Sequence, residues 1–473
     1  MPPPGPFGAQ GRVRPAVRPV ARRVERYRPD FLMKLMGLIV LTTIWRVQDV
    51  VPGLSPTRMA LLSTALAAVL LVLDTAPIRR FAHLRSPATW LLAALTLQLT
   101  LATFASASFG KSRSFMVKDF AWTLVIFVVA AGVIRSVKDL RWLAAVHVAG
   151  AGIFSFFVLT RFRAVDYAGR LCCVPYYDAN DVSLVLISTI PYALFFLRDA
   201  LRIKGSRERM WALAALLPII PVFQLAGSRG GFLGLGVVIV CAMFTYRGIK
   251  PGKRMLAPIL ALGGLLIIGG PAYRKKIATL FAPEKDYNVT EADGRIGMWK
   301  SGMGLVRQRP FVGFGPRMFS EAYGRFSTRA LELGGVPWRA AHNAYVEIMA
   351  ETGVPGAVLF AAMLLTSIAL CVRYRKRALA PALGTDGQIL AMLAQSNAIG
   401  LLGFVVGSIF LSSEYLTMPY LMVGWTVAIG KVVRLLEEQA RAAQSNNPDV
   451  GRRAPLGMGR APLVRSRSVA VRA

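Results

Sequence analysis

Three short segments carry side chains whose types and spacing could bind a phosphate or move a proton. The first is Gly227-Ser228-Arg229-Gly230-Gly231, which joins two apolar blocks. A guanidinium at the edge of a bilayer is costly to bury without a partner, so such a residue is a functional candidate by default. The flanking glycines permit a sharp turn and a close approach by a phosphate. They favour anion binding over an arginine that caps the turn and reaches the lipid headgroups.

The second segment is Gly294-Arg295, with Trp299 four residues later, at the predicted start of a helix. A guanidinium beside a helix N-terminus can hold a phosphate with two hydrogen bonds, because the backbone donors and the helix dipole favour an anion there. The alternative is a solvated arginine. The spacing therefore predicts a second cationic group for the same kind of ligand.

The third segment is His342-Asn343-Ala344-Tyr345, with Glu347 close behind it. A neutral imidazole can accept a proton near pH 7, which makes His342 a candidate general base. The other two histidines fall in a basic loop (His83) and inside an apolar block (His147). A helix-capping or structural histidine is the alternative for His342.

The elements that must position these segments are membrane spans. Of the 473 residues, 55% are hydrophobic, and the mean hydropathy is +0.49. Several apolar blocks approach the roughly 20 residues that cross hydrocarbon as a helix. We predict an all-α bundle with twelve spans near 31–50, 59–75, 88–109, 115–134, 142–160, 181–197, 211–227, 230–246, 255–271, 354–372, 389–412 and 416–433.

The distribution of lysine and arginine predicts the orientation of this bundle. The short loops 76–87, 135–141, 198–210, 247–254 and 373–388 hold 19 such residues, whereas the alternate short loops hold 7. Positive charge is retained in the cytoplasm during insertion. The sequence therefore predicts a basic cytoplasmic arm (1–30), spans one to nine (31–271), a large external loop (272–353), spans ten to twelve (354–433) and a basic cytoplasmic tail (434–473).

The net charge of +33 is explained in large part by position. Seven arginines lie in residues 1–30 and eight in residues 434–473, where they could rest on anionic lipid. No zinc-finger spacing or aromatic nucleic-acid motif is present, so we expect no nucleic-acid partner. Two cysteines fall inside spans, and the adjacent Cys172 and Cys173 are interpreted as structural. The histidine spacing predicts no metal site and implies no cofactor.

The loop 272–353 exceeds the usual length of a connection, and loops of that size are uncommon unless they are functional. Ile296, Trp299, Met303 and Val306 recur at helical spacing, and Arg309-Pro310 ends that helix. A glycine-rich turn follows at residues 310–316, with further helices expected over about 318–333 and 341–352. We expect a small helical lid over the outer face.

In this order and topology, the segments resemble the O-antigen ligase and O-antigen polymerase superfamily of bacterial membrane glycosyltransferases. The resemblance runs from about residue 170 to 356. It rests on Asp178-Ala179-Asn180-Asp181, Ser228-Arg229-Gly230, Gly294-Arg295 with Trp299, the turn from Pro310 to Gly315, and His342-Asn343 with Glu351 and Gly353. It implies a fold similar to the GT-C class of membrane glycosyltransferases.

The resemblance implies transfer of a glycan from an undecaprenyl-diphosphate donor to a lipid or glycan acceptor, without nucleotide or metal. It places the reaction at the periplasmic face of the bacterial inner membrane, with membrane lipids around the protein. Carried over by position, Arg229 and Arg295 bind the diphosphate and His342 deprotonates or orients the acceptor. Further candidates for substrate binding are Arg170, Asn180 and Asn343, although Asn180 could instead cap the helix that follows it.

Three other functions stay open at this point. The donor motifs serve both a ligase and a polymerase that extends lipid-linked repeat units, and the His342 helix with the span that follows it modestly favours a ligase. A protein O-oligosaccharyltransferase is a further relative. A polysaccharide or lipid transporter would suit twelve spans with polar residues such as Asp74, His147 and Asn397, yet no repeat between the two halves is evident.

Overall fold

The computed structural model describes residues 27–54, 57–162, 176–202, 207–245, 270–278, 294–332 and 339–445, with a few single positions between 171 and 174 and between 252 and 290. In these residues the chain is helical and forms no strand. Arg170, Cys172 and Cys173 lie outside the described residues, as do most of the span predicted over 255–271 and most of the two basic termini.

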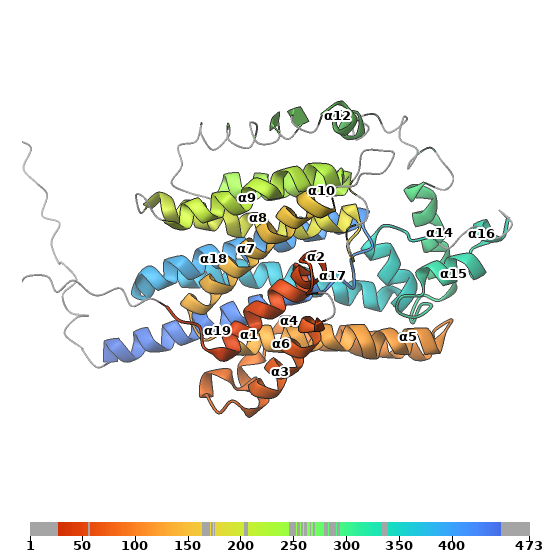
Figure 1. The fold of residues 1–473 in the computed structure, drawn as a ribbon. Helices are drawn as coiled ribbons and strands as arrows, with labels where there is room; N and C mark the ends of the chain where they lie inside the picture. The colour runs from red at the N-terminus through yellow and green to blue at the C-terminus, as the bar shows by residue number, and fades with distance from the viewer. Residues whose placement is uncertain are drawn as a thin grey trace, which may run out of the picture.

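The helices of the N-terminal half pack as a bundle (Figure 1). Their bounds are α1 Phe31–Ile39, η1 Val40–Ile44, α2 Val47–Val50, α3 Met59–Leu73, η3 Pro77–Arg79, η4 Phe81–Leu84, α4 Pro87–Phe104, α5 Phe109–Phe115, η5 Met116–Phe120, α6 Ala121–Val133, α7 Val137–Arg161, α8 Ala179–Arg202, α9 Arg207–Ala226 and α10 Arg229–Thr245.

The C-terminal half contributes short helices followed by three long ones. Their bounds are α12 Gly270–Ala278, α14 Arg295–Gln308, α15 Phe319–Phe326, α16 Thr328–Glu332, α17 Ala344–Ala378, η7 Pro381–Leu383, α18 Gly384–Gly407, η8 Ser408–Phe410 and α19 Thr417–Ser445.

The long apolar helices identify a multi-pass membrane protein. Among the described residues, seven helices are long and apolar enough to cross a bilayer, and four apolar helices of 10–17 residues accompany them. Large apolar side chains such as Trp90, Leu97 and Phe156 are exposed on the bundle, as a lipid-facing surface requires. The predicted count of twelve spans stays a prediction.

Two predicted boundaries were wrong. The span predicted over 31–50 is interrupted after Ile44, because Arg46 adopts a left-handed backbone conformation (φ 49°). Residues 110–114, predicted as a loop, belong to a continuous helical stretch from Phe109 to Val133. Two basic residues such as Lys111 and Arg113 can lie in a helix that extends past the bilayer. The hydropathy pattern does not show how far a helix continues beyond its apolar block.

Three of the loops predicted to be cytoplasmic lie together. The buried Arg79 donates to Asp74 and to Asp30, at 2.6 Å each, and Asp30 also pairs with Arg135 at 2.7 Å. A third loop joins through α19, where Arg377 Nε donates to Glu437 at 2.9 Å and Arg434 donates to the His83 carbonyl at 3.3 Å. Loops 76–87, 135–141 and 373–388 therefore share one end of the bundle.

The helices α14, α15 and α16 lie at the other end, beyond the bundle (Figure 1), and are called the outer helices below. They have a core of their own, built from Met298, Leu305, Phe314, Phe319, Ala322 and Tyr323. An ion pair of 2.7 Å between Lys111 of α5 and Glu321 of α15 ties them to the bundle. The predicted helices of the loop 272–353 are thus present, with the second divided into α15 and α16.

The glycine-rich turn, residues 310–316, docks on a break in α17. Gly353 adopts a non-helical conformation (φ 75°, ψ 175°), which interrupts the hydrogen-bond ladder of α17. The carbonyls of Ala350 and Glu351 accept the N–H groups of Phe314 and Gly315 at 3.0 and 2.8 Å. Buried backbone groups need such partners, so the turn replaces the helical bonds that the break removes.

The opposite edge of the break is closed in the same way. Val354 N–H donates to the Pro310 carbonyl at 2.7 Å. The side-chain amide of Gln98, on α4, donates to the carbonyls of Phe311 and Thr352 at 2.7 and 2.8 Å. The turn, α17 and α4 are therefore held as one unit beneath the outer helices.

We expect Gly353→Ala to unseat this turn. A Cβ at Gly353 would lie 2.4 Å from the Phe311 carbonyl carbon, in addition to the strain of φ 75°. Gly53→Ala is the matched control, because its φ of 79° is similar but no atom lies within 4 Å of the added Cβ. Strain alone costs about 1 kcal/mol, and a backbone clash adds about 1–3 kcal/mol. The Tm of purified protein should fall clearly more for Gly353→Ala than for Gly53→Ala, and equal losses would contradict this role of the break.

Candidate functional site

Arg229 is the first residue of α10, at the end of the bundle that faces the outer helices. Ser228 Oγ accepts the Gly231 N–H at 3.1 Å, which caps this helix start. Only glycines fit behind the arginine, since a Cβ at Gly230 would lie 2.8 Å from Phe410 Cβ and one at Gly231 would lie 2.5 Å from Ser183 Oγ. The glycines therefore seat the start of α10 closely against η8 and α8, and Arg229 remains partly buried.

Arg295 is likewise the first residue of its helix, α14, with Gly294 at the N-cap. One turn later, Trp299 lies with its ring 6.3 Å from the Phe410 ring, between centroids. Trp299 Nε1 also donates to the Ala341 carbonyl at 3.0 Å. This indole ties the outer helix that carries Arg295 to the residue just before His342.

His342 precedes α17 in a left-handed backbone conformation (φ 51°) and is partly buried. Asn343 Oδ1 accepts the N–H groups of Tyr345 and Val346 at 3.0 and 3.2 Å, so Asn343 is the N-cap of α17. The cap explains why an asparagine follows the histidine. His342 therefore lies directly before the N-cap of α17.

Phe410 is the point at which these three segments meet. It contacts the start of α10 through Gly230, and it contacts α14 through Trp299, which in turn bonds to Ala341 beside His342. The structure thus brings together the segments of Arg229, Arg295 and His342. Sequence reasoning missed Phe410, because a phenylalanine at the end of an apolar block has no distinguishing signal.

Buried carboxyl groups lie beneath His342. Glu347, which is 4% exposed, accepts the Ala341 and His342 N–H groups on one oxygen, at 2.6 and 3.2 Å. One turn later, Glu351 accepts the N–H groups of Arg317 and Phe319, at 2.9 and 2.8 Å. The first glutamate holds the histidine segment, and the second holds the chain after the glycine-rich turn.

Glu414 is the third buried carboxyl group and was also missed from the sequence. It is 2% exposed and lies in the short connection between η8 and α19. Burial raises the pKa of Glu414 well above its ordinary value, and the charges of Glu347 and Glu351 raise it further. The hydrogen bond between the two side chains raises the pKa of Glu414 and lowers that of Glu347, so it favours a proton on Glu414. In the sequence, Glu414 could have been recognised as the only charged residue of the short connection 411–416.

The start of α8 lies against the same site. Asp178 Oδ1 accepts the Asp181 N–H at 2.7 Å, so Asp178 caps α8. The suggestion that Asn180 caps this helix was wrong, because Asn180 already lies in the first turn of α8 and is buried there. Its neighbour Ser183 meets Gly231 of α10, which places Asn180 close to the Arg229 segment.

The gathered helix starts give the site its chemical character. Helices α10 and α14 begin at Arg229 and Arg295, and α17 begins just after His342. The N-terminus of a helix carries partial positive charge and free N–H donors, which favour an anion. Two guanidinium groups add full positive charge and can bind a phosphate with paired hydrogen bonds. A site of this kind can bind a diphosphate beside a proton acceptor.

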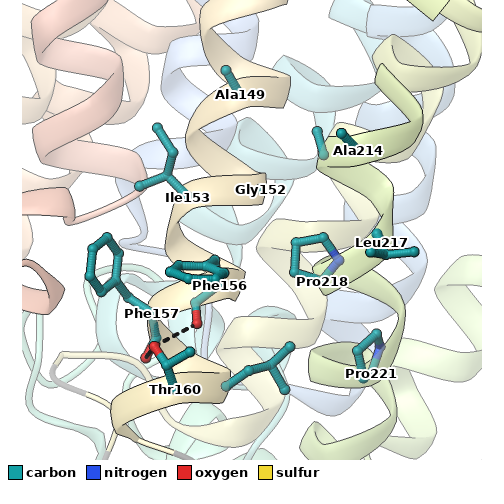
Figure 2. Close-up of a pocket in the computed structure, with 12 residues that line it drawn as sticks. Ala149, Gly152, Ile153, Phe156, Phe157, Thr160, Ala214, Leu217, Pro218 and Pro221 are labelled. Carbon is teal, nitrogen blue, oxygen red and sulfur yellow. Dashed lines mark hydrogen bonds between the residues drawn. The ribbon is translucent and has the colours of Figure 1, made fainter. Parts of the chain in front are cut away.

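A separate apolar groove of about 660 Å³ lies between α7 and α9 (Figure 2). Phe156, Phe157, Pro218 and Pro221 are among its lining residues, and none of the lining residues is charged. The hydroxyl of Thr160 is turned to the Phe156 carbonyl at 3.0 Å. The groove therefore offers contact to apolar groups and no acid–base chemistry.

Comparison with known proteins finds a family whose model covers these segments. Residues 212–361, which include Arg229, Arg295 and His342, match the family model described as O-antigen ligase. This match confirms the resemblance to the O-antigen ligase and O-antigen polymerase superfamily. An uncharacterised protein of Haemophilus influenzae is 23% identical over 205 residues, which cover 40% of this chain and 48% of that protein. The chain thus matches about half the length of this curated relative.

We expect Glu414→Gln to change how stability depends on pH. Above about pH 4.5 the unfolded carboxyl group loses its proton whereas the buried one keeps it, so this group costs the wild type up to about 1.4 kcal/mol per pH unit. Glutamine is neutral and can still donate to Glu347. The Tm of the variant, relative to wild type, should therefore rise between pH 5 and 8. Exposed Glu438→Gln is the control, and a pH-independent difference for Glu414→Gln would contradict this protonation state.

Proposed function

We propose that this chain, whose residues 212–361 match the O-antigen ligase family, transfers a glycan from undecaprenyl diphosphate to an acceptor hydroxyl. The observation that carries the proposal is the convergence of the Arg229, Arg295 and His342 segments on Phe410. It supplies two cations for a diphosphate and one proton acceptor at the same end of a membrane bundle.

The proposed reaction needs one proton transfer and one displacement. A nitrogen of His342 takes the proton of the acceptor hydroxyl as that oxygen attacks the anomeric carbon of the donor glycan. A new C–O bond forms to the acceptor while the C–O bond to the diphosphate breaks, and undecaprenyl diphosphate leaves with the electron pair. Attack opposite the leaving group inverts the anomeric centre. General-base help of this kind contributes typically 10²–10⁴-fold to the rate.

Arg229 and Arg295 stabilise the departing diphosphate in this proposal. Negative charge grows on the leaving oxygen in the transition state, and fixed cations near it lower the barrier. Each arginine is the first residue of a helix. The free backbone N–H groups at that end carry partial positive charge, which adds to the charge of the guanidinium. Asn180 and Asn343 line the neighbouring helix starts, where Asn343 acts chiefly by setting the start of α17.

The proposed location is the bacterial inner membrane, with both termini cytoplasmic and the site at the periplasmic face. The clustered basic loops 76–87, 135–141 and 373–388 support this orientation, because they share the end of the bundle opposite the outer helices. Under this orientation the residues 272–353 are the periplasmic lid.

A polymerase that extends lipid-linked repeat units is the alternative within the family. The donor site would serve both enzymes, since each binds a diphosphate and activates a hydroxyl. Only the acceptor differs, which is a lipid A core or similar terminal acceptor for a ligase and a second lipid-linked glycan for a polymerase. Product analysis with both acceptors separates them.

A transporter is less well supported. The polar residues that favoured it are bonded within the bundle: His147 to Trp45 Nε1 at 3.0 Å, and Asn397 to Tyr192 at 2.7 Å. Asp74 pairs with Arg79 at the loop end. These bonds account for the polar residues as contacts between helices, so no substrate path is needed to explain them.

We expect His342→Ala to abolish glycan transfer by purified protein in liposomes that contain undecaprenyl-diphosphate glycan and an acceptor. Loss of the base removes about 10²–10⁴-fold in kcat while the donor KM stays similar. His83→Ala is the control, because His83 lies among the basic loops. Turnover by His342→Ala at the wild-type rate would rule out the proposed base.

Replacement of Arg229 or Arg295 by lysine should weaken transfer through the donor. A lysine keeps the charge but presents a single ammonium, which cannot reproduce the paired bonds of a guanidinium. We expect each variant to lose about tenfold or more in kcat/KM for the donor, with the acceptor KM unchanged. Arg80→Lys, at an exposed position near the basic loops, is the control. Wild-type donor kinetics in both variants would remove the arginines from the diphosphate site.

A further inference from the structure

The backbone at His342 has an unusual requirement. A non-glycine residue at φ 51° costs about 1 kcal/mol and persists only where its surroundings hold it. Ala341 and His342 lie before the start of α17, so their N–H groups have no carbonyl of that helix to bond. Both N–H groups instead donate to Oε1 of Glu347, at 2.6 and 3.2 Å.

Glu347 is itself held firmly. Ser412 Oγ donates to the same oxygen at 2.6 Å, and a side-chain interaction with Glu414 favours the charged form of Glu347. A carboxylate accepts hydrogen bonds only, and three of these donors converge on one oxygen of a side chain that is 4% exposed. Burial raises the pKa of Glu347, and the hydrogen bonds from Ser412, Glu414 and the two backbone N–H groups oppose that rise because they favour the charged form.

We propose that Glu347 positions His342 for the reaction, by fixing the backbone turn that carries the imidazole and by placing a negative charge next to it. This inference rests on the proposed function for its kinetic part only. When the imidazole takes the acceptor's proton it becomes a cation, and a carboxylate nearby stabilises that cation. Glu347 bonds to the histidine backbone, so we assign it a positioning role.

Other charged groups face the same region and set the background for any titration. The groups on the elements packed around Glu347 are Glu351 of α17, Glu414 and Tyr415 before α19, Asp178 and Asp181 at α8, Arg317 after the glycine-rich turn, Arg295 of α14 and Arg229 of α10. The cations disfavour an imidazolium and the carboxylates favour it. Removal of one carboxylate therefore has a predictable sign.

Glu351 provides a matched control on the same helix. It is buried like Glu347 and also accepts two backbone N–H groups and a hydroxyl, that of Tyr415 at 2.6 Å. Its backbone partners are Arg317 and Phe319, which follow the glycine-rich turn. Glu351→Gln thus makes the same side-chain substitution one turn away from the histidine.

The test is a titration of the imidazole itself. The chain has three histidines, so uniformly histidine-labelled protein in detergent gives few NMR signals, and His342→Ala assigns the one of interest. Glu347→Gln keeps an acceptor oxygen but removes the charge, and it should lower the pKa of His342 by about 1. Glu351→Gln should lower it clearly less. Equal pKa values in wild type and Glu347→Gln would overturn the proposed charge effect.

Transfer kinetics supply the second readout. In Glu347→Gln, the acidic limb of the pH profile of kcat should move to lower pH with the imidazole, and kcat should fall about tenfold with an unchanged donor KM. Glu347→Asp keeps the charge but shortens the side chain, so it should lose the backbone bonds and lower kcat at least tenfold. Wild-type kcat in Glu347→Asp would overturn the backbone role, even if Glu347→Gln fails to fold. The titration needs no substrate, so it decides the inference even where the wild type transfers no glycan.

Discussion

The break in α17 at Gly353 is the constraint on which the site depends. A membrane helix can interrupt its hydrogen-bond ladder only where other groups replace the lost partners, because lipid offers none. Here the N–H groups of Phe314 and Gly315 replace them, and Val354 finds the Pro310 carbonyl. One set of backbone hydrogen bonds therefore anchors the outer helices on α17, the helix that begins just after His342.

Two glutamates in the first turns of α17 hold two different segments of the chain. Glu347 and Glu351 are one turn apart on α17, and each accepts a pair of backbone N–H groups from a segment that has left regular structure. Burial of two carboxylates near a third would be costly if all three were charged. Burial and the charges of Glu347 and Glu351 raise the pKa of Glu414, which favours a proton on Glu414 and so reduces the repulsion. The acidic groups thus hold the backbone on both sides of the glycine-rich turn and the histidine segment.

Local patterns predicted the helices better than their ends. The start of α14 at Arg295 and its end before Pro310 follow from a helical repeat and a proline, both of which are local signals. The interruption at Arg46, the helical residues 109–114 and the cap of α8 by Asp178 were missed. The first depends on a left-handed backbone at Arg46, the second on how far a helix extends beyond the apolar block, and the third on which of two nearby polar residues faces the free N–H groups. Hydropathy averages over such details.

By itself, the sequence determined the membrane class, the long loop and the three segments with Arg229, Arg295 and His342. Hydropathy, glycine positions and residue types are properties of short windows, so they can be read without a fold. Only the tertiary structure decided that these segments meet around Phe410 and that Glu347, Ser412 and Glu414 support the histidine. The bonds responsible join residues far apart, such as Trp299 to Ala341 and Ser412 to Glu347. Contacts across such separations arise from packing, and no spacing within one segment encodes them.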